Sequence, residues 1–247
     1  MIRNLLIVLP LLAGIAVAQT ADEVAKLIDE RSSPVDLTSD MTMILTAKNG
    51  SRRTLTTHSV RKGDTHMILW FTAPADDRGV ALLTIEKESG DEMRMWLPGF
   101  KKIRRISSSK KGGSFMGSDL SFEDLTSRTI EDYTYNLLHE ETTDGVEYWT
   151  LESIPDPSLR SSYGRIVSKV RKSDAFVVQE SYYDRGDELL KERTIEVGEF
   201  GQYSLPIKML VRNVQTSHTT DIIFDNIEVD TGVELSLFHE RNLRRLP

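Results

Sequence analysis

The chain has 247 residues, of which 39% are hydrophobic and 28% charged, with a formal net charge of −7 and no cysteine. This composition is typical of a globular protein, and a chain of this size buries enough surface to need no disulfide or metal in its core. The absence of cysteine excludes disulfide frameworks, thiolate metal sites and thiol nucleophiles. The acidic charge weighs against a nucleic-acid partner.

The N-terminus has the pattern of a secretory signal peptide. Arg3 supplies the positive start, Leu5–Val17 the apolar stretch, and Ala16-Val17-Ala18 a small-residue cleavage site. The apolar stretch is shorter than the roughly 20 residues that cross a bilayer comfortably. No cysteine follows the cleavage site, so no lipid anchor forms there. We expect a signal peptide over residues 1–18 and a free periplasmic protein that starts at Gln19.

The first predicted element of the mature chain is an amphipathic helix. Thr20-Ala21-Asp22-Glu23 has the pattern of a capping box, and Val24, Leu27 and Ile28 follow at helical spacing. Ser32-Ser33-Pro34 ends the helix, because the residue before a proline avoids the helical conformation.

From Asp36 onward the hydrophobic period changes to two. Short alternating runs, from Met41–Thr46 to Asp221–Val229, are separated by turn signals such as Asn49-Gly50 and Asp144-Gly145. This spacing predicts an antiparallel meander of about eleven strands, too many for a flat open sheet. We therefore predict a mainly β fold, a strongly curved sheet or partial barrel, in a single domain over residues 19–247.

One long segment, Ser107–Ile130, interrupts the strand pattern. It starts with a polar, glycine-containing stretch, and Ser121-x-x-Asp124 is a second capping box, with Phe122 and Leu125 on one face of a predicted short helix. We expect this segment to lie across the sheet. A last short helix or turn is predicted over Leu235–Leu243.

Motifs of the common enzyme and metal sites are absent from the sequence. The five histidines form no pair at metal-ligand spacing, and there is no nucleophile elbow or phosphate-binding loop. We therefore expect neither an enzyme, nor a metal, nor a cofactor. A pair of carboxylates that meets only in the folded chain stays open as an alternative.

The only dense basic run is Lys101-Lys102-Ile103-Arg104-Arg105, continued by Lys110-Lys111. Its alternation predicts that Ile103 and Arg105 point inward and Lys102 and Arg104 outward. Two interpretations are open: an edge strand whose cations block pairing with other sheets, or a contact surface for anionic lipid head groups or a membrane partner.

Several of the first strands carry large apolar residues on both faces, as in Met67–Phe71 and Met93–Trp96. Methionine adapts to irregular ligands such as acyl chains, but it also fills ordinary cores. A curved sheet covered by helices can enclose an apolar cavity. This pattern fits both lipid binding and plain core packing.

Two longer motifs resemble a known family. They are Trp96-Leu97-Pro98-Gly99-Phe100-Lys101-Lys102-Ile103-Arg104-Arg105-Ile106 and Ser114-Phe115-Met116-Gly117-Ser118-Asp119-Leu120-Ser121-Phe122-Glu123-Asp124-Leu125. Both are similar to the LolA-like outer-membrane lipoprotein-sorting proteins, in a branch associated with RND-type exporters. The resemblance implies an unclosed antiparallel β-barrel with a few short helices as a lid over a hydrophobic cavity.

The resemblance also implies a function. It predicts a periplasmic carrier that takes the acyl chains of a lipoprotein or phospholipid-like cargo from an inner-membrane transporter of ABC or RND type to an outer-membrane acceptor. The alternative is an adaptor of an RND-type lipid exporter without stable cargo. We expect a monomer that shields its cargo as a chaperone does.

These expectations assign candidate site residues. As a hypothesis, the acyl-chain cavity and lid consist of Met43, Met67, Leu69, Phe71, Leu82, Met93, Met95, Phe115, Met116, Phe122 and Leu125. Gly112, Gly113 and Gly117 would let the lid open. Contact with a partner or with head groups is assigned to Lys101, Lys102, Arg104 and Arg105.

Overall fold

The computed structural model describes residues 19–87 and 90–247. The predicted signal peptide, residues 1–18, lies outside the described residues. Within the described part, no helix combines the length and the apolar character that a membrane crossing requires.

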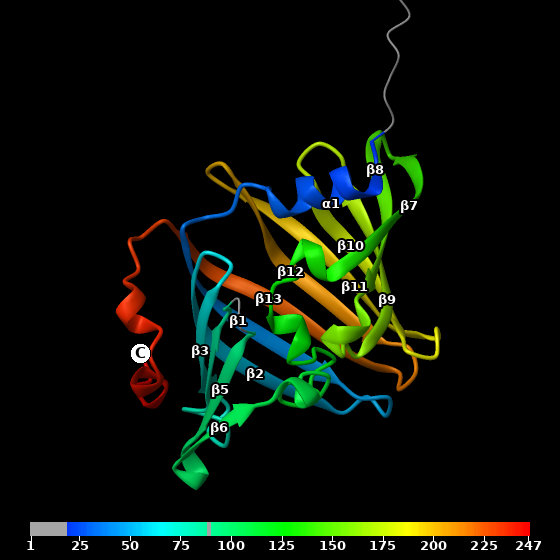
Figure 1. Cartoon of the computed structure of the whole chain (residues 1–247). Coiled ribbons are helices and arrows are strands. Elements are labelled where there is room, and N and C mark those ends of the chain that lie inside the picture. The colour runs from blue at the N-terminus through cyan, green and yellow to red at the C-terminus, as the bar shows by residue number, and fades with distance from the viewer. Residues whose placement is uncertain (1–18, 88–89) are drawn as a thin grey trace, which may run out of the picture.

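One α-helix, α1 (Ala21–Asp29), precedes a single curved antiparallel sheet (Figure 1). Its strands are β1 (Asp36–Thr46), β2 (Arg52–Lys62), β3 (His66–Ala73), β4 (Ala81–Ile85), β5 (Glu92–Leu97), β6 (Lys102–Ile106), β7 (Tyr133–Thr143), β8 (Val146–Pro155), β9 (Tyr163–Arg171), β10 (Phe176–Asp184), β11 (Leu189–Phe200), β12 (Tyr203–Asn213) and β13 (His218–Val229). Short 3-10 turns are η1 (Pro98–Phe100), η2 (Ser108–Lys110), η3 (Glu123–Leu125), η4 (Ile130–Asp132), η5 (Pro157–Leu159), η6 (Leu235–Leu237) and η7 (Glu240–Arg244).

The mainly β class is confirmed, but the number of strands differs from the prediction. The described residues form a 13-stranded sheet, where about eleven strands were expected. The reason is that every alternating run, down to the five-residue β4 and β6, forms a strand of its own.

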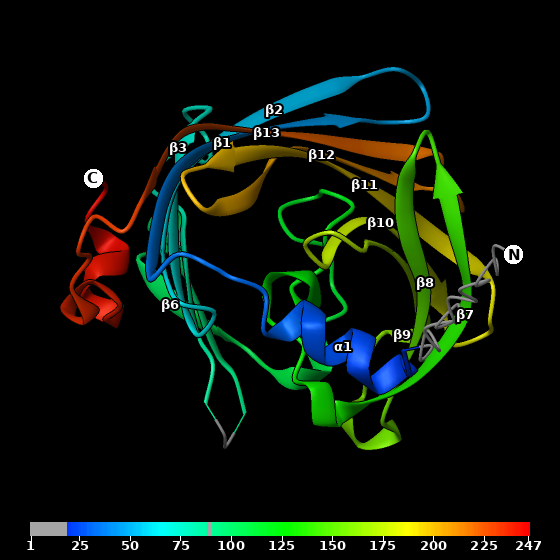
Figure 2. The ribbon, with the colours of Figure 1, turned by 90° about the horizontal axis from the view of Figure 1, so that it is seen from above.

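The sheet curls into a barrel that does not close. The strand order is β6-β5-β4-β3-β2-β1-β13-β12-β11-β10-β9-β8-β7, so that β6 and β7 are its two edges. The segment Ser107–Ile130, called the insert below, connects these edges and lies inside the ring of strands (Figure 2). The prediction that this segment lies across the sheet is therefore confirmed.

Local sequence explains the hairpins and their register. Asp144 and Gly145 in the β7–β8 turn have positive φ angles of 51° and 78°, which match the twist of a two-residue hairpin. In the longer β1–β2 turn, Gly50 takes a positive φ angle of 82° just before the strands pair. In the resulting register Met43 of β1 lies opposite Leu55 of β2 and Ile222 of β13. One apolar face of the curved sheet thus points into the barrel.

The strands β3 and β4 are buried on both faces. On the outer face, Phe238 and Leu243 of the C-terminal segment pack against Ile68, Trp70 and Leu83. The Trp70 indole N–H donates to the carbonyl oxygen of Asn242 at 3.1 Å. This cover explains why the sequence of these strands is apolar on both sides, and it confirms the short turns predicted over Leu235–Leu243.

The N-terminal helix covers the opposite side of the barrel. The predicted capping box is present, since the Glu23 amide donates to the Thr20 hydroxyl and the Thr20 amide to the Glu23 carboxylate. Val24 and Ala25 are buried against Trp149, Leu151 and Val170 of β8 and β9. The helix therefore closes one part of the barrel mouth (Figure 2).

Candidate functional site

All eleven residues predicted for the acyl-chain cavity and lid meet in one apolar cluster inside the barrel. Its sheet side is the inner face of β1–β5 with adjoining residues of β6, β12 and β13, and its other side is the insert. The predicted members are Met43, Met67, Leu69, Phe71, Leu82, Met93, Met95, Phe115, Met116, Phe122 and Leu125. The sequence pattern thus identified one continuous surface contributed by segments far apart in the chain.

Phe115 is the centre of the contact between insert and sheet. Its ring is completely buried and lies 5.7 Å, centroid to centroid, from both Phe71 of β3 and Phe122 of the insert. Aromatic rings at this separation attract each other in addition to the gain from burial. The insert therefore covers the apolar inner face of the sheet with its own side chains.

This filled interior differs from the open cavity that was expected. Met43, Leu69, Phe71, Leu82 and Met93 are all essentially inaccessible to solvent. The larger open pockets among the described residues are lined by side chains other than these five. The physical reason is that the insert's own side chains pack where an apolar ligand would otherwise lie.

The insert is also less helical than predicted. Ser121 and Asp124 make the reciprocal bonds of a capping box, the Ser121 amide donating to the Asp124 carboxylate at 2.6 Å. Only a single 3-10 turn, η3, follows. Phe122 and Leu125 face the apolar cluster, whereas Glu123 and Asp124 face the other side, toward β9–β11, and form hydrogen bonds there.

That other side is a network of buried charges on β9–β11. The Glu180 carboxylate of β10 accepts from Arg128 of the insert at 2.7 Å, from the Tyr182 hydroxyl at 2.6 Å, and from Arg193 of β11. Burial by itself raises the pKa of Glu180, but the guanidiniums of Arg128 and Arg193 outweigh burial and hold that pKa well below its ordinary value. Glu180 is therefore a carboxylate that ties the insert to the sheet.

A second buried pair lies beside the first. Lys191 of β11 donates to the Asp124 carboxylate at 2.5 Å, and the Tyr163 hydroxyl of β9 donates to it at 2.8 Å. Both charged side chains are at most 4% exposed. Burial raises the pKa of Asp124, but Lys191 more than compensates, so the pKa stays below its ordinary value. We call Asp124, Arg128, Glu180, Lys191 and Arg193 the anchor network.

Further polar contacts fix the insert on either side of this network. The Asp119 carboxylate accepts from the Thr220 hydroxyl of β13 and lies 2.7 Å from the His218 ring. The Glu123 carboxylate accepts from the Ser162 amide at 2.9 Å. Lys111, near the start of the insert, pairs with Asp91.

Between these fixed points lies the segment Gly112–Ser118, here called the plug segment. Toward the sheet it is held by Phe115 and Met116 in the apolar cluster and by one long hydrogen bond, 3.4 Å, from Arg53 to the Met116 carbonyl oxygen. Within the insert, its backbone is bonded to residues 120–122, the Phe115 amide donating to the Leu120 carbonyl oxygen and the Phe122 amide to the Gly113 carbonyl oxygen. Met116 and Gly117 have positive φ angles of 53° and 83°. The plug segment is thus the part of the central insert whose docking depends mostly on apolar burial.

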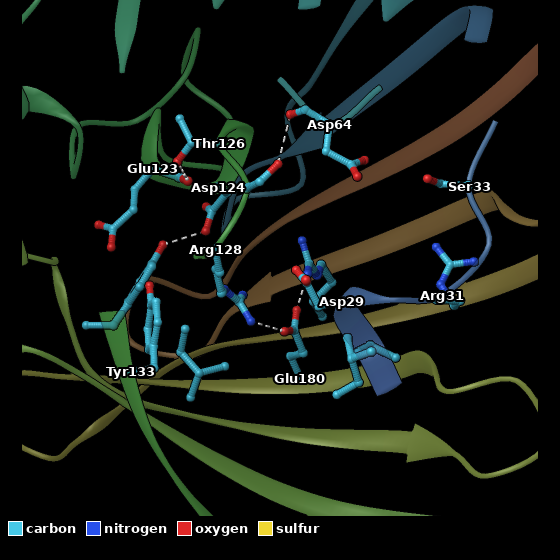
Figure 3. Close-up of a pocket in the computed structure, with 16 residues that line it drawn as sticks. Asp29, Arg31, Ser33, Asp64, Glu123, Asp124, Thr126, Arg128, Tyr133 and Glu180 are labelled. Carbon is cyan, nitrogen blue, oxygen red and sulfur yellow. Dashed lines mark hydrogen bonds and ion pairs between the residues drawn. The ribbon is translucent and has the colours of Figure 1, made fainter. Parts of the chain in front are cut away.

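A polar cavity of about 340 Å³ lies next to the anchor network, below α1. Figure 3 shows Arg128 and Glu180 facing each other within it, with Asp29, Arg31 and Asp64 along the rim. Of its charged groups, Asp124, Arg128, Glu180 and Arg193 form ion pairs of the anchor network. Among the described residues, no group of His, Asp and Glu side chains is arranged as metal ligands.

The predicted basic surface lies at the edge strand β6 and the turn before it. Lys101, Lys102, Arg104 and Arg105 are all exposed. The predicted facing of this strand was wrong: Ile103 lies opposite Trp96 and packs under the C-terminal segment on the outer face, whereas Arg104 lies opposite Met95 on the inner side. The C-terminal segment covers the outer face of the sheet with apolar side chains. Alternation along the strand does not predict this cover, so it does not show which side of β6 is buried.

Comparison with known proteins places this architecture in a family. A family model described as "Uncharacterized protein" matches residues 63–245. A structure from Vibrio parahaemolyticus, described as an outer membrane lipoprotein-sorting protein domain, is 30% identical over 91% of this chain and 98% of that one, with a TM-score of 0.83. A LolA superfamily protein from Nitrosomonas europaea, 19% identical over 91% and 99% of the two chains, has the same fold, with a TM-score of 0.73.

The chain belongs to the LolA-like superfamily. The resemblance inferred from the two motifs is thereby confirmed. A DUF1329 family protein from Desulfovibrio piger is also similar, with 28% identity, a TM-score of 0.86, and coverage of 90% of this chain and 97% of that one. A search of curated proteins found no match.

Sequence reasoning missed the anchor network of this LolA-like protein. The signal was present in the hairpin around Arg185-Gly186-Asp187, because its register sets Glu180 opposite Arg193 and Tyr182 opposite Lys191. Charged residues at alternate positions that share a face with tyrosines indicate a polar interior. A β-bulge next to Tyr182 shifts the register, so counting residues from the turn alone does not give these pairs.

Proposed function

We propose that this LolA-like protein is a periplasmic carrier that binds an acyl chain of a lipoprotein or phospholipid-like cargo on the inner face of β1–β5 and passes it from the inner toward the outer membrane. The observation that carries the proposal is the single apolar cluster in which the plug segment covers the apolar inner face of the sheet. In this proposal the plug segment occupies the site in the cargo-free state.

Energetics support an exchange of plug for cargo. Each buried methylene contributes about 0.8 kcal/mol, and exposing a side chain such as Phe115 or Met116 costs about 1.5–3 kcal/mol. An acyl chain of about a dozen methylenes therefore offsets the release of two or three plug side chains. Release of cargo is favoured in turn because the plug can return, which keeps affinity moderate.

The second candidate is an adaptor of an RND-type lipid exporter without stable cargo. It is favoured by one observation, the complete burial of Phe115 in the apolar cluster. If the plug never leaves, the barrel is a rigid body that only contacts other proteins.

Native mass spectrometry of the chain purified from a bacterial periplasm without detergent separates the two. A stoichiometric acyl-bearing adduct, identified by lipid analysis of the extract, is expected for the carrier. A bare protein mass, together with failure to take up a photoreactive phospholipid, would establish the adaptor instead.

The binding site is located by the same photoreactive phospholipid. Cross-links are expected on inner-face residues such as Leu69, Leu82 and Met93, and none on Trp96 or Ile103 of the outer face. Replacing Phe115 and Met116 with Asp should abolish co-purification of lipid, because two carboxylates would face the acyl site. Leu235→Asp, at an exposed position of the C-terminal segment, is the matched control, and circular dichroism confirms that each variant is folded.

A further inference from the structure

The turn between β5 and β6 presents an aromatic side chain to solvent. Phe100 is 74% exposed, the highest value for any large hydrophobic residue in the described part of the chain. The turn is compact: Pro98 opens the 3-10 turn η1, the Lys101 amide donates to the Pro98 carbonyl oxygen at 3.0 Å, and Lys101 takes a left-handed conformation. Phe100 is thus held outward by the backbone.

The same hairpin carries an unbalanced positive charge. From Leu97 to Ser118 the sequence contains six basic residues and no acidic one, in a chain whose net charge is −7. Lys101, Lys102, Arg104 and Arg105 are exposed, and within residues 19–87 and 90–247 they form no ion pair. Their charge is therefore available to an external anion.

The position of the hairpin suits a contact site. Figure 1 shows the turn after β5 projecting at the end of the molecule that lies away from α1. Protection of the sheet edge explains cations on β6. It does not explain an outward phenylalanine at the tip of the turn, where no strand edge needs to be blocked.

An aromatic ring flanked by cations matches the chemistry of an anionic membrane interface, where rings settle at head-group depth and Lys and Arg bind lipid phosphates. We propose that the β5–β6 hairpin docks the protein on an anionic lipid surface, with Phe100 inserted at the interface and the four cations over the head groups. The proposal deepens the carrier function and rests on it, since a carrier must meet a membrane to exchange cargo.

Sedimentation with vesicles tests this docking, using the full chain without its signal peptide and phosphatidylcholine vesicles that contain about 30% phosphatidylglycerol. Binding is expected to these vesicles and not to pure phosphatidylcholine, and to weaken with salt. Phe100→Ala should weaken binding about tenfold through the lost apolar insertion. Lys101→Glu with Lys102→Glu should weaken it at least about 25-fold, from about fivefold for each cation.

Matched controls come from elsewhere on the surface. Leu235→Ala removes another exposed hydrophobic residue, and Lys48→Glu with Arg212→Glu makes the same change of net charge at exposed sites; neither should weaken binding. Phe100→Trp adds a probe whose emission should be quenched by brominated lipids in the vesicles.

Absence of binding to the anionic vesicles, or equal losses in the Phe100 and Leu235 variants, would overturn the docking proposal. The outcome is separable from that of the carrier function. Lipid co-purified with the unaltered protein reports the carrier function, and vesicle sedimentation reports docking. Lipid-bearing protein that does not sediment therefore contradicts the docking proposal alone, and lipid-free protein that sediments contradicts the carrier function alone.

Discussion

The inner faces of β1–β5 and of β9–β11 both contact the insert, but with different chemistry. On β1–β5 the contact is apolar, centred on Phe115, and any apolar group of suitable size can replace it. On β9–β11 the contact consists of buried ion pairs such as Asp124 with Lys191, which need particular partners at particular distances. An acyl chain can therefore compete for the first contact and cannot compete for the second.

This difference divides the insert into a replaceable and a fixed part. Displacing the plug segment exposes apolar side chains that the cargo's own burial offsets. Displacing Arg128 would remove one of the two guanidiniums that pair with Glu180, a carboxylate that is only 1% exposed. In the proposed function, the barrel therefore opens for cargo at the plug segment while the rest of the insert stays in place.

The largest expected effect comes from removing the anion at the centre of the anchor network. Glu180→Ala leaves Arg128 and Arg193 buried without their partner and should lower the free energy of unfolding by about 3–5 kcal/mol. Glu196→Ala on β11, which removes an exposed pair with Lys208, should cost less than about 1 kcal/mol. Urea unfolding measures both, and similar losses in the two variants would contradict the role of the network.

A smaller, state-dependent effect is expected on the apolar side. Phe115→Ala should lower the free energy of unfolding by about 3 kcal/mol in the cargo-free protein, because it empties a fully buried site. In lipid-loaded protein the loss should be much smaller, since the plug has already left. Urea unfolding with and without bound lipid measures the difference, and the same loss in both states would mean that Phe115 stays in place when cargo binds.

The smallest effect concerns acid stability. The pKa of Glu180 is lowered on folding from its ordinary value of 4.5, so the unfolded chain takes up a proton first and stability falls as the pH drops below about 4.5. One such group contributes at most about 1.4 kcal/mol per pH unit. Glu180→Gln should be less stable than the unaltered protein at neutral pH but lose stability less steeply in acid, and parallel curves would count against an ionised Glu180.

Much of the apolar side could be predicted from the sequence, and little of the polar side. Alternation and turn signals identify residues such as Met43, Leu82 and Met93 because strand faces repeat every two residues and hairpins keep them aligned. The pairing of Glu180 with Arg193 depends on register past a β-bulge, and that of Arg128 with Glu180 on the path of the insert through the barrel. The facing of Ile103 depends on a C-terminal segment more than a hundred residues away in the chain. Contacts of this kind arise from tertiary packing, and the local sequence pattern does not identify the partners.

The central claim is that cargo displaces the plug segment and leaves the anchor network intact. Amide hydrogen exchange, compared between lipid-loaded and lipid-free protein, tests it directly. Peptides covering residues 112–118 should exchange faster in the loaded protein, because the hydrogen bond from the Phe115 amide to the Leu120 carbonyl oxygen opens with the plug. Peptides covering residues 123–128 and 178–193 should keep their protection. Unchanged exchange at residues 112–118, or equal loss of protection across both regions, would contradict the account.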